Sequence, residues 1–147
     1  MHSYGSYDPA LAAEFIASWE GKRLTAYTCS AGVWTIGFGH TVGVNPGDQC
    51  TDEQAMKWLI EDIQKHVDQL AHYINVPVSQ NEFIALTSLA FNVGVGAVSR
   101  SNLLRKLNTG DSEGAAEEFL DFCYAGGKRV DGLYNRRKAE YELFLSK

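Results

Sequence analysis

The feature that most constrains the fold is a long amphipathic segment between Thr51 and Pro77. Its apolar residues recur at steps of three and four, which is the period of one helix face. Thr51 and Gln54 have the spacing of a capping box, and Pro77 sets the latest point at which the helix can end. The apolar positions are Met56, Leu59, Ile60, Ile63, Val67, Leu70 and Ile74. This pattern predicts a helix of about 24 residues, roughly 36 Å long, which can connect two lobes.

The chain before this helix indicates one short helix followed by a small sheet. Asp8 and Pro9 favour a helix start, and Gly21 favours its end. The apolar stripe expected on this helix consists of Leu11, Phe15, Ile16 and Trp19. From Leu24 to about Gln49, alternating runs of Thr, Tyr, Val and Trp surround a Ser-Ala-Gly turn. This pattern predicts an antiparallel hairpin or a three-stranded sheet.

The chain after the long helix shows helical signals and no strand pattern. Ser79 and Glu82 form a second capping box, before a helix that Gly94 and Gly96 should end. Asp111 is the expected N-cap of a later helix. The helices are expected over 83–92, 101–108, 112–124 and 134–145.

Together these signals predict an α+β, mainly α fold with two lobes. A small antiparallel β-lobe is expected over about 22–50, and a helical lobe over about 76–147 together with the N-terminal helix. The two lobes would make up a single domain over 1–147. A cleft between two such lobes is a common place for an elongated substrate.

The composition excludes several classes of protein. No apolar run approaches the roughly 20 residues that span a bilayer, and the first residues lack the basic and apolar regions of a secretory signal. A net charge of -5 argues against a nucleic-acid binder. Nine of the 13 Lys and Arg residues nevertheless lie between Arg100 and Lys147. They form either a solvated helix face or a positive surface for an anionic polymer.

The cysteine and histidine residues predict neither a disulfide framework nor a metal site. The three cysteines are an odd number and form no CxxC pair, and the four histidines lack the spacing of zinc ligands. We therefore expect no metal and no cofactor. Cys50 and Cys123 are interpreted as small thiols that fill the core.

The residue that best fits a general acid is Glu20. It follows an apolar helix, directly after Trp19 and before Gly21. The negative end of a helix dipole and aromatic neighbours both disfavour the charged form of a carboxyl group. A carboxyl group that stays protonated near neutral pH is what a general acid requires. An isolated glutamate at a helix end is, however, more often an ordinary surface residue.

The surroundings of Glu20 resemble the active-site region of phage-type lysozymes, glycoside hydrolase family 24. That family has Glu, eight residues, Asp or Cys, five residues and Thr, which is the spacing of Glu20, Cys29 and Thr35. The similarity continues through GVWTIGFGHT (32–41), FNVG (91–94), LLRKLN (103–108), AGGK (125–128) and GLYNRR (132–137). It covers nearly the whole chain after about residue 9.

The resemblance implies hydrolysis of the β-1,4 bond between N-acetylmuramic acid and N-acetylglucosamine in bacterial peptidoglycan, with inversion at the anomeric carbon. It implies that Glu20 protonates the leaving oxygen. Cys29 and Thr35 would assist and position a water molecule on the opposite face of the sugar, as in inverting glycosidases. An enzyme of this kind is an endolysin, which lyses the host cell.

Cys29 stands where the resemblance leads us to expect aspartate in most relatives. A free thiol has a pKa near about 8.5, so that only a few per cent is thiolate at neutral pH. Lys22 or Arg23 could increase that fraction. Oxidation of Cys29 to a sulfenic acid, or to a disulfide with Cys50 or Cys123, would remove the base, and a redox switch is therefore an open alternative.

Five other residues are expected to support the site. By resemblance, Arg136 of the last helix pairs with the catalytic acid, which would favour the charged carboxylate and oppose the helix dipole. His40 is interpreted as a structural contact that holds the turn of the β-lobe. Trp34 and Phe38 could stack on sugar faces or pack in the core, and Asn92 is expected to hydrogen-bond the backbone rather than substrate.

The resemblance also implies a cellular role. The expected partner is peptidoglycan, with no nucleic acid, no stable membrane insertion and a monomeric state. The protein would stay in the host cytoplasm until a separate holin releases it to the periplasm. The alternatives are a binding module that lost catalysis through Cys29, the same domain in a phage tail or as an interbacterial effector, and a lytic transglycosylase.

Overall fold

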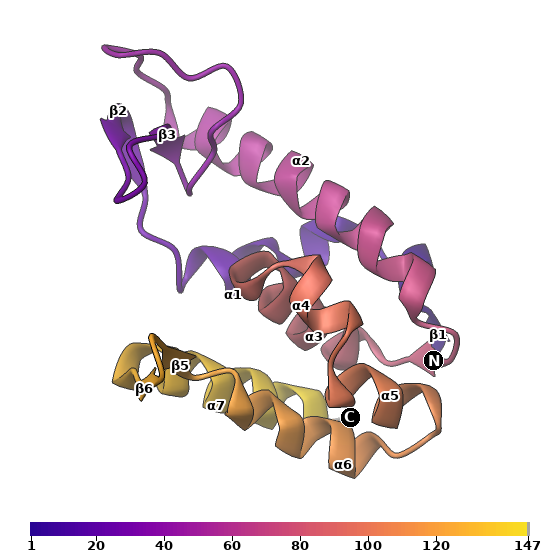
Figure 1. Ribbon diagram of the computed structural model, residues 1–147. Coiled ribbons are helices and arrows are strands. Elements are labelled where there is room, and N and C mark those ends of the chain that lie inside the picture. The colour runs from indigo at the N-terminus through magenta and orange to yellow at the C-terminus, as the bar shows by residue number, and fades with distance from the viewer. Residues whose placement is uncertain (147) are drawn as a thin grey trace.

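The computed structural model describes residues 1–146 and has the two-lobe arrangement that the sequence predicts (Figure 1). A two-stranded β-lobe lies at the start of the long helix α2 (Asp52–Leu70), and the remaining helices lie to one side of it. The fold is α+β and mainly helical, with small antiparallel sheets. None of the helices in the described part of the chain is both long and apolar enough to cross a membrane.

The long helix begins with the predicted capping box. Thr51 Oγ1 accepts a hydrogen bond from the backbone N–H of Gln54 at 3.1 Å, and the Gln54 side chain accepts one from the Thr51 N–H at 3.1 Å. The helix ends earlier than Ile74, because the chain tightens into a 3-10 turn, η3 (Ala71–Tyr73). Its buried stripe is Ala55, Leu59, Ile63, Val67 and Leu70. Leu59, Ile63, Val67 and Leu70 of this stripe belong to the hydrophobic core of the helical lobe.

The β-lobe contains the simpler of the two predicted arrangements, a hairpin. Strand β2 (Arg23–Thr28) pairs with β3 (Trp34–Gly37), and the following loop adds only an isolated bridge. Gly37 has a φ of +68°, and a Cβ atom there would lie 3.3 Å from the Cβ of Ala55. The glycine therefore lets the hairpin approach α2 closely.

The N-terminal helix is shorter than predicted. A 3-10 turn, η2 (Pro9–Ala12), continues into α1 (Ala13–Ala17), and Asp8 caps it as expected. The helix ends before Gly21, because the next N–H groups fold back to the carbonyl of Ile16 in a tight turn.

The apolar stripe predicted for this helix is only partly buried. Ile16 is fully buried, whereas 40% of Leu11 and 37% of Trp19 are exposed. A 3-10 turn has three residues per turn, so the α-helical register assumed for the stripe does not hold along the whole segment.

The helical lobe is built around α3 (Gln80–Val93), which begins with the predicted capping box of Ser79 and Glu82. Ser101 and Asp111 cap two of the shorter helices that follow. The remaining elements are α4 (Val95–Ser99), α5 (Asn102–Asn108), α6 (Ser112–Glu118), the 3-10 turn η4 (Phe119–Asp121) and α7 (Asp131–Leu145).

Three predicted boundaries in this lobe are wrong. Gly94 ends α3 as predicted, but Gly96 lies inside α4 instead of ending a helix, and the helix expected to reach residue 124 ends at Glu118. The last helix begins at Asp131, so that Gly132 lies inside it. Glycine weakens a helix by only about 1 kcal/mol, and packing of α4 and α7 against α3 exceeds that cost.

The expectation that no strand follows the long helix is also wrong. Strand β4 (Pro77–Val78) pairs with β1 (His2–Ser3), and β5 (Tyr124–Ala125) pairs with β6 (Lys128–Arg129). Strands of two residues are too short to show an alternating pattern. The two glycines between β5 and β6 both have positive φ, as a tight hairpin turn requires.

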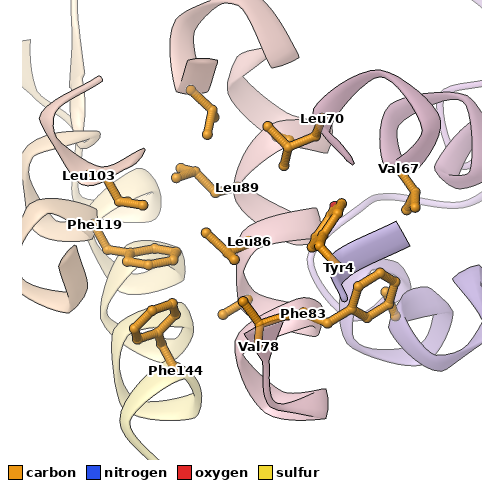
Figure 2. Packing of buried hydrophobic residues seen from close by; sticks show 14 of the residues in the cluster. Tyr4, Val67, Leu70, Val78, Phe83, Leu86, Leu89, Leu103, Phe119 and Phe144 are labelled. Atoms are coloured by element: carbon orange, nitrogen blue, oxygen red, sulfur yellow. The ribbon is translucent and has the colours of Figure 1, made fainter. Parts of the chain in front are cut away.

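The hydrophobic core lies on both sides of α3 (Figure 2). Leu86 lies near Phe119 and Phe144, whose ring centroids are 5.2 Å apart. On the other side, Phe83 contacts Tyr4 of the 3-10 turn η1 (Tyr4–Ser6), with ring centroids 5.1 Å apart. This core holds the N-terminal segment, α3 and α7 together.

Candidate active site

The turn after α1 places Glu20 against the last helix. Arg136 Nη1 donates a hydrogen bond to Glu20 Oε2 at 2.9 Å. The Glu20 side chain is 25% exposed, whereas that of Arg136 is only 5% exposed. The carboxyl group of Glu20 therefore forms an ion pair with a nearly buried cation on its inner side and is open to solvent on its outer side.

Two open hollows meet at Glu20. The first, of about 350 Å³, lies between the turn of the β-lobe, α2 and α3, and its other lining residues are Phe38, Gly39, Thr41, Val42, Asp62, Lys65, His66 and Phe91. The second, of about 410 Å³, lies beside the start of α7, and its other lining residues are Trp19, Asn92, Val130, Gly132, Leu133, Asn135 and Arg136. Because they share Glu20, the two hollows can receive one elongated ligand.

Some of the residues singled out from the sequence come together here. Phe38 lines the first hollow, and Asn92 and Arg136 line the second. The Asn92 side-chain oxygen accepts a hydrogen bond from Arg137 Nη2 at 2.9 Å. The hydrogen-bond partner of Asn92 is therefore a side chain. The expectation that Asn92 bonds the backbone is wrong.

Other residues singled out from the sequence do not line these hollows. Trp34 is half-buried on β3, and Cys29 and Thr35 lie together in the hairpin. Among the described residues, no hydrogen bond joins any of these three to Glu20. In the free protein, Glu20 and Arg136 thus contact each other, whereas the hairpin residues Cys29, Trp34 and Thr35 form no hydrogen bond with that pair.

Cys29 lies at the hairpin turn, where local donors stabilise its thiolate. The backbone N–H groups of Val33 and Ala31, and the hydroxyl of Thr35, hold the pKa of the Cys29 thiol below its ordinary value. Thr35 is only 3% exposed, and its single hydroxyl proton can be donated either to the Cys29 sulfur or to the Val33 carbonyl, which lies 3.0 Å from Oγ1. The lowered pKa increases the thiolate fraction at neutral pH.

The two basic residues that could have acted on Cys29 have other partners. Lys22 forms an ion pair with Asp52 at the start of α2, and the Arg23 guanidinium lies 4.8 Å from the ring centroid of Tyr27. The pKa of the Cys29 thiol is therefore lowered by hydrogen bonds rather than by a neighbouring cation.

His40 connects the turn of the β-lobe to α2. Its Nδ1 lies 3.0 Å from Asp62 Oδ2, and its ring stacks on Trp58 with centroids 4.8 Å apart and an interplanar angle of 7°. These contacts fit the structural interpretation made from the sequence, and they reach across to the helix rather than staying within the turn.

Sequence reasoning gave no role to the residues of α2 that line the first hollow. His66 Nδ1 lies 2.7 Å from the Asp62 carbonyl, and its ring centroid is 5.0 Å from that of Phe91. Lys65 lines the same hollow. Asp62, Lys65 and His66 are three or four residues apart on one helix face, which was the signal that could have identified them.

A buried charge network behind Arg136 was also missed. Arg137 and Glu140 are fully buried, and Arg137 Nε lies 2.8 Å from Glu140 Oε1. Ser88 Oγ donates a hydrogen bond to Glu140 Oε2 at 2.5 Å. Burial raises the pKa of the Glu140 carboxyl group and lowers that of the Arg137 guanidinium. The i, i+3 spacing of the two α7 residues was available in the sequence, whereas Ser88 carries no such signal.

The three cysteines are all free in the structure. Cys123 is buried, in agreement with the core interpretation, but Cys50 is only half-buried. Burial and the nearby Asp52 carboxylate raise the pKa of the Cys50 thiol. Within residues 1–146, no three His, Cys, Asp or Glu side chains are grouped so that they could hold a metal ion.

Known proteins share this fold and the sequence around it. The family model for phage lysozyme matches residues 17–140. The chain is 48% identical over 135 residues to an endolysin of Acyrthosiphon pisum secondary endosymbiont phage 1, which covers 89% of this chain and 92% of that protein.

Solved structures give the same result. The muramidase domain of SpmX from Asticaccaulis excentricus has a TM-score of 0.87 and 34% identity over 92% of this chain and 95% of that one. A mutant of the lysozyme of Salmonella phage P22 has a TM-score of 0.84 and 39% identity over the same shares of the two chains. The chain therefore belongs to the phage lysozyme family.

Proposed function

We propose that this chain is an endolysin-type muramidase that hydrolyses the β-1,4 bond between N-acetylmuramic acid and N-acetylglucosamine in bacterial peptidoglycan, and so lyses the host cell. The observation that carries the proposal is a partly exposed carboxyl group, Glu20, held by Arg136 where two hollows meet between the lobes. The names of the similar proteins, an endolysin and a muramidase domain, support the same activity.

Glu20 is the general acid of the proposed reaction. Its open side lines both hollows, where the leaving glycosidic oxygen would take its proton. Arg136 then stabilises the carboxylate that remains, through the hydrogen bond of 2.9 Å. The attacking water gives its hydroxyl group to the anomeric carbon and its proton to the base, and exchange with solvent then takes a proton from the base and returns one to Glu20.

Cys29 and Thr35 act on the attacking water in this proposal. Attack from the face opposite Glu20 inverts the anomeric carbon, and inverting enzymes separate their two groups widely enough for that water. The lowered pKa of the Cys29 thiol supports a role in which its thiolate accepts a proton from the attacking water.

The direct test is lysis of chloroform-treated Gram-negative cells by purified protein. Glu20→Gln keeps the shape of the side chain but removes its transferable proton, so the rate of turbidity loss should fall at least about 100-fold. Glu14→Gln is the matched control, because Glu14 is an exposed glutamate of α1, the helix that precedes Glu20. Cleared walls should release muropeptides with hydrated reducing ends.

Other outcomes of this assay identify the alternatives. Wild-type protein that binds walls under reducing conditions and never cleaves them would be a binding module. Anhydro ends on the released muropeptides would identify a lytic transglycosylase. Cys29→Ser and Cys29→Asp, assayed with and without reductant, test the water side, and equal activity of Cys29→Ser would exclude a required thiolate.

The cellular part of the proposal is a monomer that stays in the host cytoplasm until a holin releases it, and then acts on the wall from the periplasm. The related endolysins support action on the cell wall. Gel filtration tests the monomer. Expression with and without a holin tests release, and lysis without one would contradict it.

A further inference from the structure

We propose that Glu140, Ser88 and Arg137 form a buried positioning unit that fixes the orientation of Arg136 and, through it, of Glu20. The inference rests on the proposed function, because Glu20 is taken as the group that protonates the substrate. None of the three residues lines the hollows beside Glu20, so they can act on the site only through Arg136.

The unit contacts Arg136 from two elements. On α7, Glu140 Oε2 accepts a hydrogen bond from Arg136 Nε at 3.4 Å. On α3, the carbonyl and hydroxyl oxygens of Ser88 each accept one from Arg136 Nη2 at 3.3 Å. The third nitrogen, Nη1, donates to Glu20. Two nitrogens of the guanidinium plane are thus held from behind, and the plane directs the remaining one at the carboxyl group of the acid.

Glu140 is itself held in one orientation. Its Oε2 accepts hydrogen bonds from Ser88 Oγ at 2.5 Å and from Arg137 Nη2 at 3.2 Å, while Oε1 lies 2.8 Å from Arg137 Nε. Arg137 is held in turn by Asn92 at 2.9 Å. Glu140 and Arg137 are both fully buried, so water cannot replace a lost partner. The network therefore transmits a fixed geometry to Arg136.

The charges in the unit give it a second effect. Arg136 and Arg137 are neighbouring cations, and Glu140 is the buried anion that both of them contact. The other ionisable groups that face them are Glu20 on the outer side of Arg136 and the buried thiol of Cys123, which acts on Arg137. Glu140 and Glu20 therefore share Arg136, one from behind and one from the open side, so the charge of Glu140 also acts on the pair that Arg136 forms with Glu20.

Glu140→Gln tests both effects, because it keeps the size of the side chain and removes its charge. We expect kcat for peptidoglycan hydrolysis to fall about ten- to a hundredfold, as small displacements of catalytic groups do, with KM changed less than about twofold. The alkaline limb of the pH–activity profile should move to lower pH, because the variant removes one negative charge from behind Arg136. Glu142→Gln, at an exposed glutamate of the same helix, should change none of these.

Ser88→Ala separates position from charge. It removes one hydroxyl from the unit and leaves Glu140 charged, so we expect kcat to fall about three- to tenfold, in line with one hydrogen bond. The pH profile should not move. A purely structural role would lower the melting temperature of both variants without shifting the pH profile of the folded protein.

The guanidinium resonances of Arg136 provide a readout that needs no activity. In ¹⁵N NMR, the Nε–H signal of Arg136 should be sharp and slow to exchange in the wild type, and broad and fast to exchange in Glu140→Gln. If the wild type cleaves no peptidoglycan but Arg136 shows this change, the proposed function fails and the positioning unit stands. If Glu140→Gln is folded, with Arg136 ordered and with kcat and pH profile unchanged, the positioning unit is overturned. If Glu140→Gln does not fold, Ser88→Ala decides by kcat and by the same signal.

Discussion

The two sides of the cleft obtain their geometry by different means. On the helical side, Glu20 is held by Arg136 across 116 positions of sequence, and a buried network stands behind that pair. On the β-lobe side, Cys29 and Thr35 are held mainly by the backbone of their own hairpin. Long-range packing thus specifies the position of Glu20, the proposed acid, whereas local hydrogen bonds specify the position of Cys29, which is proposed to act on water. A position held locally can change from aspartate to cysteine without disturbing the rest of the fold.

The largest expected effect lies on the helical side. Arg137→Met should lower the free energy of unfolding by about 3–5 kcal/mol, because it leaves the buried Glu140 carboxylate without its main partner. Urea denaturation measures the loss. Lys138→Ala, at an exposed neighbour on α7, is the control and should change stability by less than about 0.5 kcal/mol.

The double variant Arg137→Met/Glu140→Leu sharpens the same comparison. Replacing both buried charges with apolar groups should restore most of the stability that the single change removes. Lysis activity should nevertheless be low, because Glu140→Leu removes the carboxylate behind Arg136. Recovery of activity together with stability would show that the network serves the fold alone.

A smaller effect is expected where the hairpin meets α2. Gly37→Ala should destabilise the protein by about 2 kcal/mol, because its φ of +68° is unfavourable for alanine and its new Cβ would press against Ala55. Gly43→Ala is the matched control, since its φ of +71° is similar but nothing lies within 4 Å, and it should cost about 1 kcal/mol. Thermal unfolding measures both, and equal losses would contradict a role for the contact.

A subtler effect is expected on the reactivity of the Cys29 thiol. Its lowered pKa means that alkylation by iodoacetamide should begin at lower pH than for Cys50, whose thiol has a raised pKa. Thr35→Val removes one donor, so the pKa should rise and alkylation at neutral pH should slow roughly two- to fivefold. The stabilisation that accompanies the lowered pKa is present above the ordinary thiol pKa and is lost as pH falls through the folded value. Rates for single-cysteine variants over a pH series provide the measurement.

The smallest effect is expected from the ion pair between Lys22 and Asp52, which joins the β-lobe to α2. Both side chains are substantially exposed, at 41% and 68%, so Lys22→Ala should change stability by less than about 0.5 kcal/mol. A loss above about 1 kcal/mol in denaturant titration would mean that the hairpin depends on this contact. At high salt, which screens exposed charges, the difference in stability between the wild type and Lys22→Ala should disappear.

The features that could be predicted from the sequence are those that depend on contacts between residues close together in the chain. Both capping boxes, Thr51 with Gln54 and Ser79 with Glu82, lie within three residues and were predicted correctly. The hairpin, one of the two arrangements predicted for the β-lobe, also depends on contacts that are local in sequence. The two-residue strands are too short to show a period, and the 3-10 turn before α1 broke the register assumed for its stripe.

The site shows the same division. Spacing and family resemblance singled out Glu20 and Arg136, and the structure places them in contact. Ser88 lies 52 positions from Glu140, and a serine within an apolar helix carries no pattern that indicates such a partner. The contact between these two residues could therefore be identified only from the packing of α3 against α7 in the structure.

The distance in sequence between Glu20 and Arg136 has a consequence for biosynthesis. The ribosome makes Glu20 long before it makes α7, which supplies Arg136 and closes the core with Phe144. A chain that stops before α7 contains the hairpin and Glu20 but not Arg136. The candidate site is therefore incomplete until α7 has been translated and has packed against α3.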